Sequence, residues 1–111
     1  MIKARVTPSI ITGTITAPAS KSSMQRACAA SLIRKGETVI KNPGVSNDDM
    51  AAIDVIQKLG AVVTKLDNGN LHIVSGGVMP ECDTINCGES GLGIRMFTPI
   101  ASLSSRSITI T

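Results

Sequence analysis

The sequence predicts a mixed α/β domain (α+β) in which short strands alternate with amphipathic helices. Three observations indicate this class: β-branched runs bounded by turn residues, stretches with apolar residues at three- and four-residue steps, and one Asn-Gly pair typical of a β-hairpin. The main run of these signals gives strand, helix, strand, helix, strand, strand. A further strand, helix and strand follow it.

Two strands are predicted at the start of the chain. Residues 2–6 alternate in polarity, and residues 11–17 are rich in β-branched side chains. Pro18 ends the second strand, and residues 23–35 then carry apolar side chains at helical spacing. Gly36 stands where a helix C′ glycine belongs, directly after two basic residues that suit the negative end of a helix.

The middle of the chain predicts a strand, a helix and a hairpin. A strand at 37–41 leads through a turn to a second helix, with Asn47 as its N-cap. Strands at 61–66 and 70–74 flank Asn68-Gly69, the strongest short hairpin signal in the chain. The apolar stripe of the second helix consists of Met50, Ile53, Ile56 and Leu59.

The last part of the chain repeats the opening of this pattern. Residues 83–86 are predicted to form a strand and residues 91–103 a third helix, which Pro99 should kink or shorten. Residues 107–111 alternate as a strand, and the chain ends within it. We interpret the sequence as an N-terminal fragment, with one complete unit at about residues 13–74 and the beginning of a second.

The composition limits the classes of function. The chain has 111 residues, of which 42 % are apolar and 17 % charged, as is typical of a globular domain. Phe97 is the only aromatic residue, so stacking sites for bases are nearly absent. No run of Lys and Arg offers a surface for a polyanion, and the net charge of +3 suits a small anionic ligand. We therefore expect no nucleic-acid partner.

Targeting and cysteine signals point to the cytoplasm. No segment approaches the length of a membrane span, and the N-terminus lacks the apolar region of a signal peptide. An odd number of cysteines without a nearby histidine indicates free thiols in a reducing compartment. We expect a cytoplasmic protein without a membrane partner, a metal or a cofactor. The thiols are Cys28, Cys82 and Cys87.

Two segments share a design that suits anions, in which a strand runs into a short polar turn that becomes a helix. The first N–H groups of a helix lack partners, and its dipole end is positive. In the first segment Ser20-Lys21-Ser22 supplies hydroxyls and an ammonium, and Arg26 follows Ser22 by four residues. In the second, Gly88-Glu89-Ser90-Gly91 precedes Arg95, which follows Gly91 by four residues. Taken singly, the first segment fits an ordinary Ser cap with solvated basic residues better, and the second fits a tight turn with an exposed Arg95 better.

Other polar residues are weaker candidates. Asp48-Asp49 suits helix capping better than a general base or a metal pair, and His72 suits a surface position in its strand. Neither a Walker phosphate loop nor a G-x-G-x-x-G fingerprint is present. A single histidine, without partners in a recognisable pattern, yields no Ser/His/Asp set.

Three segments, in order along the chain, resemble the 5-enolpyruvylshikimate-3-phosphate synthase family. Residues 16–27, which include Ser20-Lys21-Ser22, are similar to the first signature of the family. Residues 45–60 resemble its Ser-Asp-Asp helix that ends in Leu-Gly, and residues 88–95 resemble its Gly-Asn-Ala-Gly segment. The resemblance covers essentially the whole chain.

The resemblance implies transfer of the enolpyruvyl group of phosphoenolpyruvate to the 5-hydroxyl of shikimate 3-phosphate, a step of aromatic amino-acid biosynthesis that is the target of glyphosate. It implies that Lys21 contacts both substrates and that Ser22 and Arg26 bind shikimate 3-phosphate. Gly91 is expected to lie against phosphoenolpyruvate, and Arg95 matches the arginine of its segment. The residues that transfer protons in the family lie beyond this chain, so no catalytic residue is expected in it.

Two residues depart from the family pattern. Glu89 replaces the usual Asn, and an acid there repels an anion unless it pairs with a base. Leu92 replaces the usual Thr and removes a hydroxyl close to the phosphoenolpyruvate side. We expect this second change to alter inhibitor sensitivity.

The resemblance also implies an architecture of two lobes, each made of three βαβαββ units, which is incomplete in this chain. Residues 1–19 are then expected to pack with the C-terminal lobe, and residues 20–111 to form part of the N-terminal lobe with Lys21 at the hinge. We expect the full-length protein to be a monomer. For the fragment alone we expect marginal stability, self-association or pairing with missing chain, because its strand edges are uncovered.

Two other functions fit part of the pattern. The related transferase that acts on UDP-N-acetylglucosamine shares the fold and the donor, but it is expected to carry Lys-Asn where this chain has Lys21-Ser22. A non-catalytic phosphate-binding module, or a purely structural domain with two ordinary helix caps, fits the helix starts alone.

Overall fold

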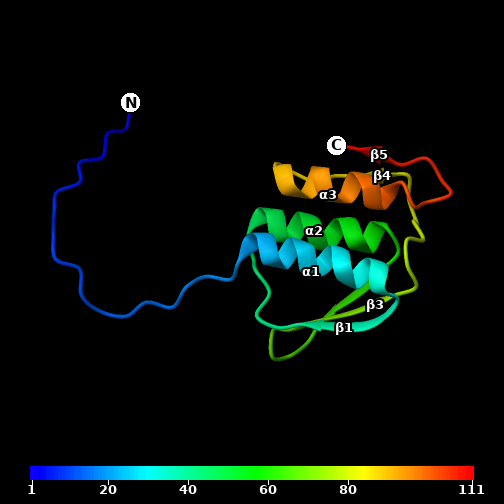
Figure 1. Cartoon of the computed structure of the whole chain (residues 1–111), viewed down its shortest axis with the longest axis horizontal. Coiled ribbons are helices and arrows are strands. Elements are labelled where there is room, and N and C mark those ends of the chain that lie inside the picture. The colour runs from blue at the N-terminus through cyan, green and yellow to red at the C-terminus, as the bar shows by residue number, and fades with distance from the viewer.

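The computed structural model describes residues 1–111, in which helices and strands form a body from residue 21 onward and the preceding residues form a long N-terminal arm (Figure 1). Its mixture of helices and strands confirms the predicted fold class, and all three predicted helices are present. In chain order the elements are α1 (Lys21–Arg34), β1 (Gly36–Ile40), α2 (Asn47–Lys58), β2 (Val62–Lys65), β3 (Leu71–Ser75), β4 (Thr84–Ile85), α3 (Gly91–Ala101) and β5 (Thr109–Ile110).

The strands form two small sheets. In the first, β3 lies between β1 and β2 and is antiparallel to both. The predicted hairpin joins β2 to β3, with Lys65 opposite Leu71 and Gly69 at a φ of 83°, a backbone conformation that glycine adopts without strain. The second sheet contains only β4 and β5, which are parallel.

The three helices run in the same direction and lie between the two sheets (Figure 1). Helices α1 and α2 pack against each other, α1 also contacts β1 and β3, and α3 packs on both helices. All three therefore begin at the end of the body where the arm leaves (Figure 1). This shared orientation places the two predicted anion-binding segments at the same end.

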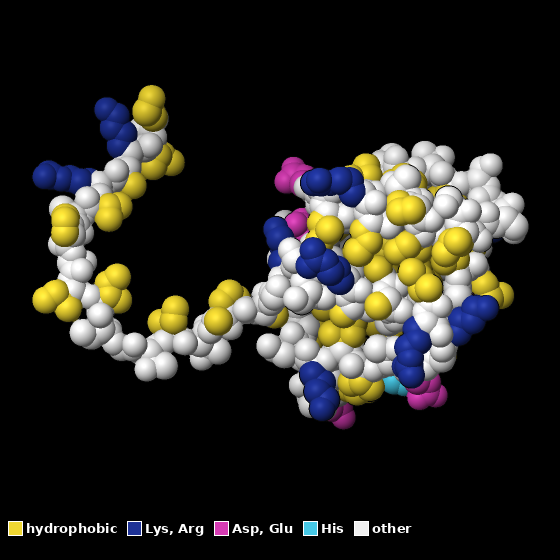
Figure 2. Space-filling view, viewed as in Figure 1, with side chains coloured by type: hydrophobic (Ala, Val, Ile, Leu, Met, Phe, Trp, Pro, Cys, Tyr) yellow, Lys and Arg dark blue, Asp and Glu magenta, His cyan; other side chains and the backbone are white.

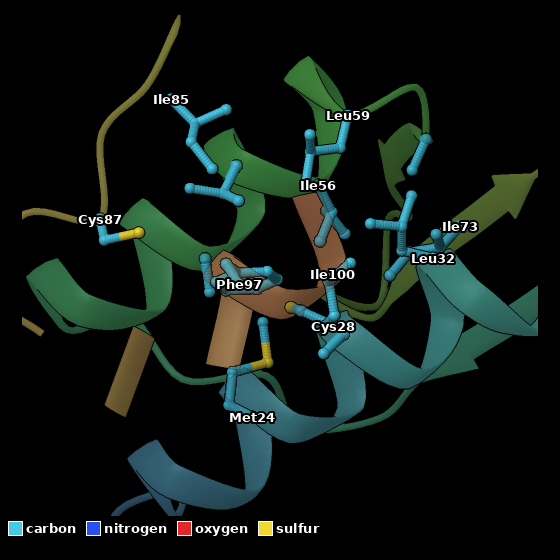
Figure 3. Packing of buried hydrophobic residues seen from close by; sticks show 14 of the residues in the cluster. Met24, Cys28, Leu32, Ile56, Leu59, Ile73, Ile85, Cys87, Phe97 and Ile100 are labelled. Atoms are coloured by element: carbon cyan, nitrogen blue, oxygen red, sulfur yellow. The ribbon is translucent and has the colours of Figure 1, made fainter. Parts of the chain in front are cut away.

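The core forms where the helices meet, and it is almost entirely aliphatic (Figure 3). Phe97, the only aromatic residue, is fully buried on α3 and lies close to Met24 in the close-up. Burying a side chain of this size contributes roughly 1.5–3 kcal/mol. Buried Ser75 on β3 donates a hydrogen bond to the carbonyl of Leu32 and so fixes the end of α1 against the sheet.

The predicted strands at 2–6 and 11–17 are not formed. Residues 1–18 are exposed, lack secondary structure, and extend away from the body (Figure 1). A strand needs a neighbour for its N–H and C=O groups, and no other part of the chain offers one here. The body therefore begins at α1, and the unit expected at 13–74 lacks its first strand.

The starts of two helices also differ from the sequence prediction. Ser20 caps α1, so Lys21 and Ser22 are helical residues and not part of the preceding turn. Ser46, not Asn47, caps α2, because its hydroxyl accepts a hydrogen bond from the N–H of Asp49. The buried face of α2 also differs from the predicted apolar stripe. Met50 is 54 % exposed, whereas Ala52 and Val55 are buried.

The third helix and the thiols agree with their predictions. Pro99 lies inside α3, which ends at Ala101, two residues earlier than predicted. All three cysteines are free; Cys28 and Cys87 are buried and Cys82 is half-buried. None of the helices combines the length and the apolar character that crossing a membrane requires.

Two adjacent residues of α1 test the position of the core. Leu32 is fully buried, whereas its neighbour Ile33 is 46 % exposed. We expect Leu32→Ala to lower the free energy of unfolding by about 2–5 kcal/mol, because it leaves a cavity among the helices. Ile33→Ala, the matched control, should lower the free energy of unfolding clearly less. Urea denaturation followed by circular dichroism measures both, and equal losses would contradict this description of α1.

Thiol reactivity gives a second test. Burial raises the pKa of Cys28 to about 12, with a further contribution from the charge of Asp49, and burial also raises the pKa of Cys87. Because the thiolate is the reactive form, we expect only Cys82 to react rapidly with Ellman's reagent at about pH 8. Cys82→Ser should abolish the fast phase, and a fast phase that persists would show that a buried thiol is accessible.

Candidate anion-binding site

Three serines cap the three helix starts at the same end of the molecule. The hydroxyl of Ser20 accepts from Ser23 N at 3.3 Å, that of Ser46 from Asp49 N at 3.3 Å, and that of Ser90 from Gly93 N at 2.8 Å. Each cap satisfies only one of the free N–H groups of its first turn. The remaining N–H groups and the aligned dipoles make this end positive and favourable for an anion.

Lys21 joins the start of α1 to the start of α2. Its Nζ lies 2.8 Å from Asp48 Oδ2, and its side chain remains 55 % exposed. The hydrogen bond to Asp48 and the negative charge of Asp48 raise the pKa of Lys21 above its ordinary value. Lys21 is therefore a fixed positive charge with two further N–H donors that can face a ligand.

The loop that leads into α2 is held by a buried carboxylate. Asp49 Oδ2 accepts hydrogen bonds from Ser46 N at 3.0 Å and from Ser46 Oγ at 2.6 Å, which completes a capping box. Gly44 lies directly against this carboxylate, and a Cβ at this position would overlap it. The second oxygen, Oδ1, is buried without a hydrogen-bond partner. This clamp fixes Asp48, which lies between Ser46 and Asp49 in the chain, where it pairs with Lys21.

A hollow of about 450 Å³ opens between the start of α1 and this loop. Lys21, Ser46 and Asp49 line it, together with the end of the arm at Pro18 and Ala19. Basic side chains gather at this end of the body, with acidic ones among them (Figure 2). The hollow is wide enough to admit a small ligand, and its polar wall carries the ammonium group.

The second predicted segment lies beside the first. Buried Ser90 Oγ donates to Gln25 Oε1 at 2.6 Å, which links the cap of α3 to α1 across 65 residues of sequence. Gln25 Nε2 also lies 3.5 Å from the carbonyl of Lys21. Gly93 leaves room for this contact, since a Cβ there would lie 3.0 Å from Ser90 Oγ.

The remaining predicted site residues lie at the same end but in different settings. Ser22 and Arg26 are exposed on the first turns of α1, one helical turn apart on the same side. Gly91 is the exposed first residue of α3, and Arg95 Nε donates to its carbonyl at 2.7 Å. The guanidinium of Arg95 is therefore folded back over the start of its own helix.

Two residues of the site could not be assigned from sequence patterns. Asp48 was expected to act in capping, together with Asp49; the structure gives that role to Asp49 and pairs Asp48 with Lys21. Gln25 is 1 % exposed, and its only sequence signal is a polar residue between the apolar positions of α1. Of the two residues that depart from the family pattern, Glu89 is exposed and Leu92 is half-buried. Glu89 forms no ion pair.

Residues outside this end of the body do not join the site. His72 lies on the outer face of the first sheet, with Nε2 3.4 Å from Glu37 Oε2. No group of three or more His, Cys, Asp and Glu side chains converges to hold a metal ion. The fold and the site together define an α/β domain in which aligned helix starts form a candidate anion-binding site.

The comparisons with known proteins identify the family. The family model described as EPSP synthase (3-phosphoshikimate 1-carboxyvinyltransferase) matches residues 6–111, and the chain belongs to this family. The chain is 34 % identical to the 3-phosphoshikimate 1-carboxyvinyltransferase of Chlamydia abortus over all of its length. It is 37 % identical to that of Methanocorpusculum labreanum over 91 % of its length.

The similarity extends to three-dimensional structure. The solved EPSP synthase from Acinetobacter baumannii matches 89 % of the chain with a TM-score of 0.75 and 22 % sequence identity, which supports the fold. The chain spans only about a quarter of the length of these relatives: 25 % of the Chlamydia abortus protein, 24 % of the Methanocorpusculum labreanum protein and 23 % of the solved structure.

The pairing of Lys21 with Asp48 has a measurable signature. Asp48→Asn removes the charge that raises the pKa of Lys21, so we expect the pKa of this lysine to fall toward its ordinary value of 10.5. NMR titration of the lysine side-chain signals measures the change. Asp54→Asn, which removes the partner of Lys58, is the matched control and should leave Lys21 unaffected. An unchanged pKa of Lys21 in Asp48→Asn would refute the pair.

Proposed function

We propose that this chain provides part of the substrate-binding lobe of a 3-phosphoshikimate 1-carboxyvinyltransferase. The complete enzyme transfers the enolpyruvyl group of phosphoenolpyruvate to the 5-hydroxyl of shikimate 3-phosphate and releases phosphate. The observation that carries the proposal is Lys21, an exposed ammonium held at joined helix starts beside a hollow. Both substrates bear a phosphate and a carboxylate, the groups that helix starts and basic side chains bind.

Shikimate 3-phosphate is proposed to lie over the start of α1. Ser22 and Arg26 are exposed on one side of this helix, and neither makes a hydrogen bond that a ligand would have to break. A hydroxyl and a planar guanidinium one turn apart suit the oxygens of a phosphate group. Lys21 would contact this substrate and its neighbour, because it stands between α1 and α2.

Phosphoenolpyruvate is proposed to lie over the start of α3. The guanidinium of Arg95 lies over exposed Gly91, and its terminal nitrogens remain available to an anion while its Nε is bonded to the Gly91 carbonyl. The exposed and unpaired Glu89 opposes an anion at this position. A basic group from another part of the enzyme would offset this repulsion.

The proposed enzyme needs more chain than these residues supply. The groups that transfer protons, and the lobe against which residues 1–19 would pack, are expected outside this sequence. Closure of two lobes over both anions would then bring basic groups from each side onto the substrates. We propose that the full-length enzyme is a cytoplasmic monomer. This chain alone would self-associate where its strand edges are uncovered.

Replacement of Lys21 tests the proposal. In the enzyme that carries this segment, Lys21→Ala should lower kcat/KM by roughly 10- to 150-fold, because a hydrogen bond to a charged group contributes about 1.5–3 kcal/mol. Lys35→Ala, at the opposite end of α1, is the matched control, and its kcat/KM should stay close to that of the unmodified enzyme. Release of phosphate from phosphoenolpyruvate measures turnover. An unchanged kcat/KM in Lys21→Ala would show that Lys21 does not contribute to substrate binding.

A further inference from the structure

A second hollow lies on the other side of the loop that borders the hollow beside Lys21. The two hollows share residues 42–45, and the second is closed by the start of α2 and the tip of the β2–β3 hairpin. Its volume of about 330 Å³ falls within the range of small-molecule sites, roughly 300–1,000 Å³. None of the residues assigned above to substrate binding lines it.

One hydrogen bond joins the two walls of this hollow, and a second orders the hairpin wall. The backbone N–H of Asn42 lies 3.4 Å from Asn70 Oδ1, which joins the loop to the hairpin across 28 residues of sequence. The N–H of Asn70 donates to Asn68 Oδ1 at 3.0 Å. Asn42 has a φ of 50°, a left-handed conformation that Asn adopts more readily than most residues other than glycine, and it shapes the loop wall.

One wall of the hollow is apolar and faces solvent. Val45 is 84 % exposed and Met50 is 54 % exposed, and half-buried Ile53 lies behind them. An apolar body placed against these side chains would bury them and gain roughly 25 cal/mol for each Å² removed from water.

The opposite wall carries donors. The ammonium of Lys65 is exposed and forms no ion pair with any Asp or Glu. The side chains of Asn68 and Asn70 make hydrogen bonds through their oxygens only. Their amide NH₂ groups therefore remain available as donors. No acidic residue lines the hollow, so a negative group there would meet the ammonium of Lys65 without an opposing carboxylate in the lining.

We propose that this hollow binds a small organic carboxylate with an apolar body. The carboxylate accepts hydrogen bonds from Lys65 and from the amide groups of Asn68 and Asn70, and the body packs on Val45 and Met50. A single ammonium is a point charge that matches the one negative charge of a carboxylate, and the hollow has no arginine fork for bidentate recognition of a phosphate. The site is separate from the proposed substrate site, and its occupancy does not depend on the enzymatic function.

The test uses benzoate as the probe and benzyl alcohol as its uncharged counterpart. In NMR titrations of the chain, we expect benzoate to shift the backbone signals of Val45, Asn68, Gly69 and Asn70. Benzyl alcohol should bind the same place roughly 2- to 5-fold more weakly, the ratio that an exposed ion pair provides. Shifts confined to the helix starts at Ser20 and Ser90 would overturn the proposal and leave the proposed function unaffected.

Two lysine variants complete the experiment. Lys65→Met should reduce the affinity for benzoate to that for benzyl alcohol. Lys41→Met is the matched control, because Lys41 is an exposed lysine next to the same loop that does not line the hollow, and it should retain the preference for benzoate. Equal binding of the two probes to the unmodified chain, no saturable shift with either, or a preference that survives in Lys65→Met would each refute the site.

Discussion

The parallel alignment of α1, α2 and α3 sets the electrostatics of the molecule. Helix dipoles that lie side by side and point the same way repel each other, and each adds about half a positive charge at the shared end. Only α2 has acidic residues in its first turn, and Lys21 pairs with one of them, Asp48. Core packing around Phe97 holds the helices together against this repulsion. An anion bound at the helix starts would remove much of it, so ligand and fold would stabilise each other.

Local sequence patterns predict much of this fold. The hairpin at Asn68-Gly69, the helix end before Gly36 and the three helices depend on interactions between residues only a few positions apart, and all of them are present. The helix starts at Ser20 and Ser90 also depend on local interactions, and both serines cap a helix at the two segments that the sequence singles out. Their family-like order along the chain agrees with the family assignment.

Local sequence patterns could not predict contacts between residues that lie far apart in the chain. The buried bond from Ser90 to Gln25 spans 65 residues, and the choice of Asp48 as the partner of Lys21 depends on how α2 is set beside α1. The error in the N-terminal arm has the same cause. Residues 11–17 have the composition of a strand, but composition cannot supply the neighbouring strand that would complete the hydrogen bonds.

Gly44 lies in a segment with the composition of an exposed turn, but its surroundings in the structure resemble those of a core residue. Asn42-Pro43-Gly44 has the composition of an exposed turn, where Asn, Asp or Ser would usually be accepted in place of glycine. Here Gly44 is buried, its φ is not positive, and the Asp49 carboxylate occupies the space of a side chain. Tolerance to mutation at this position should therefore resemble that of the core, even though it lies in a loop. A variant that changes this residue would act on the site without touching a ligand.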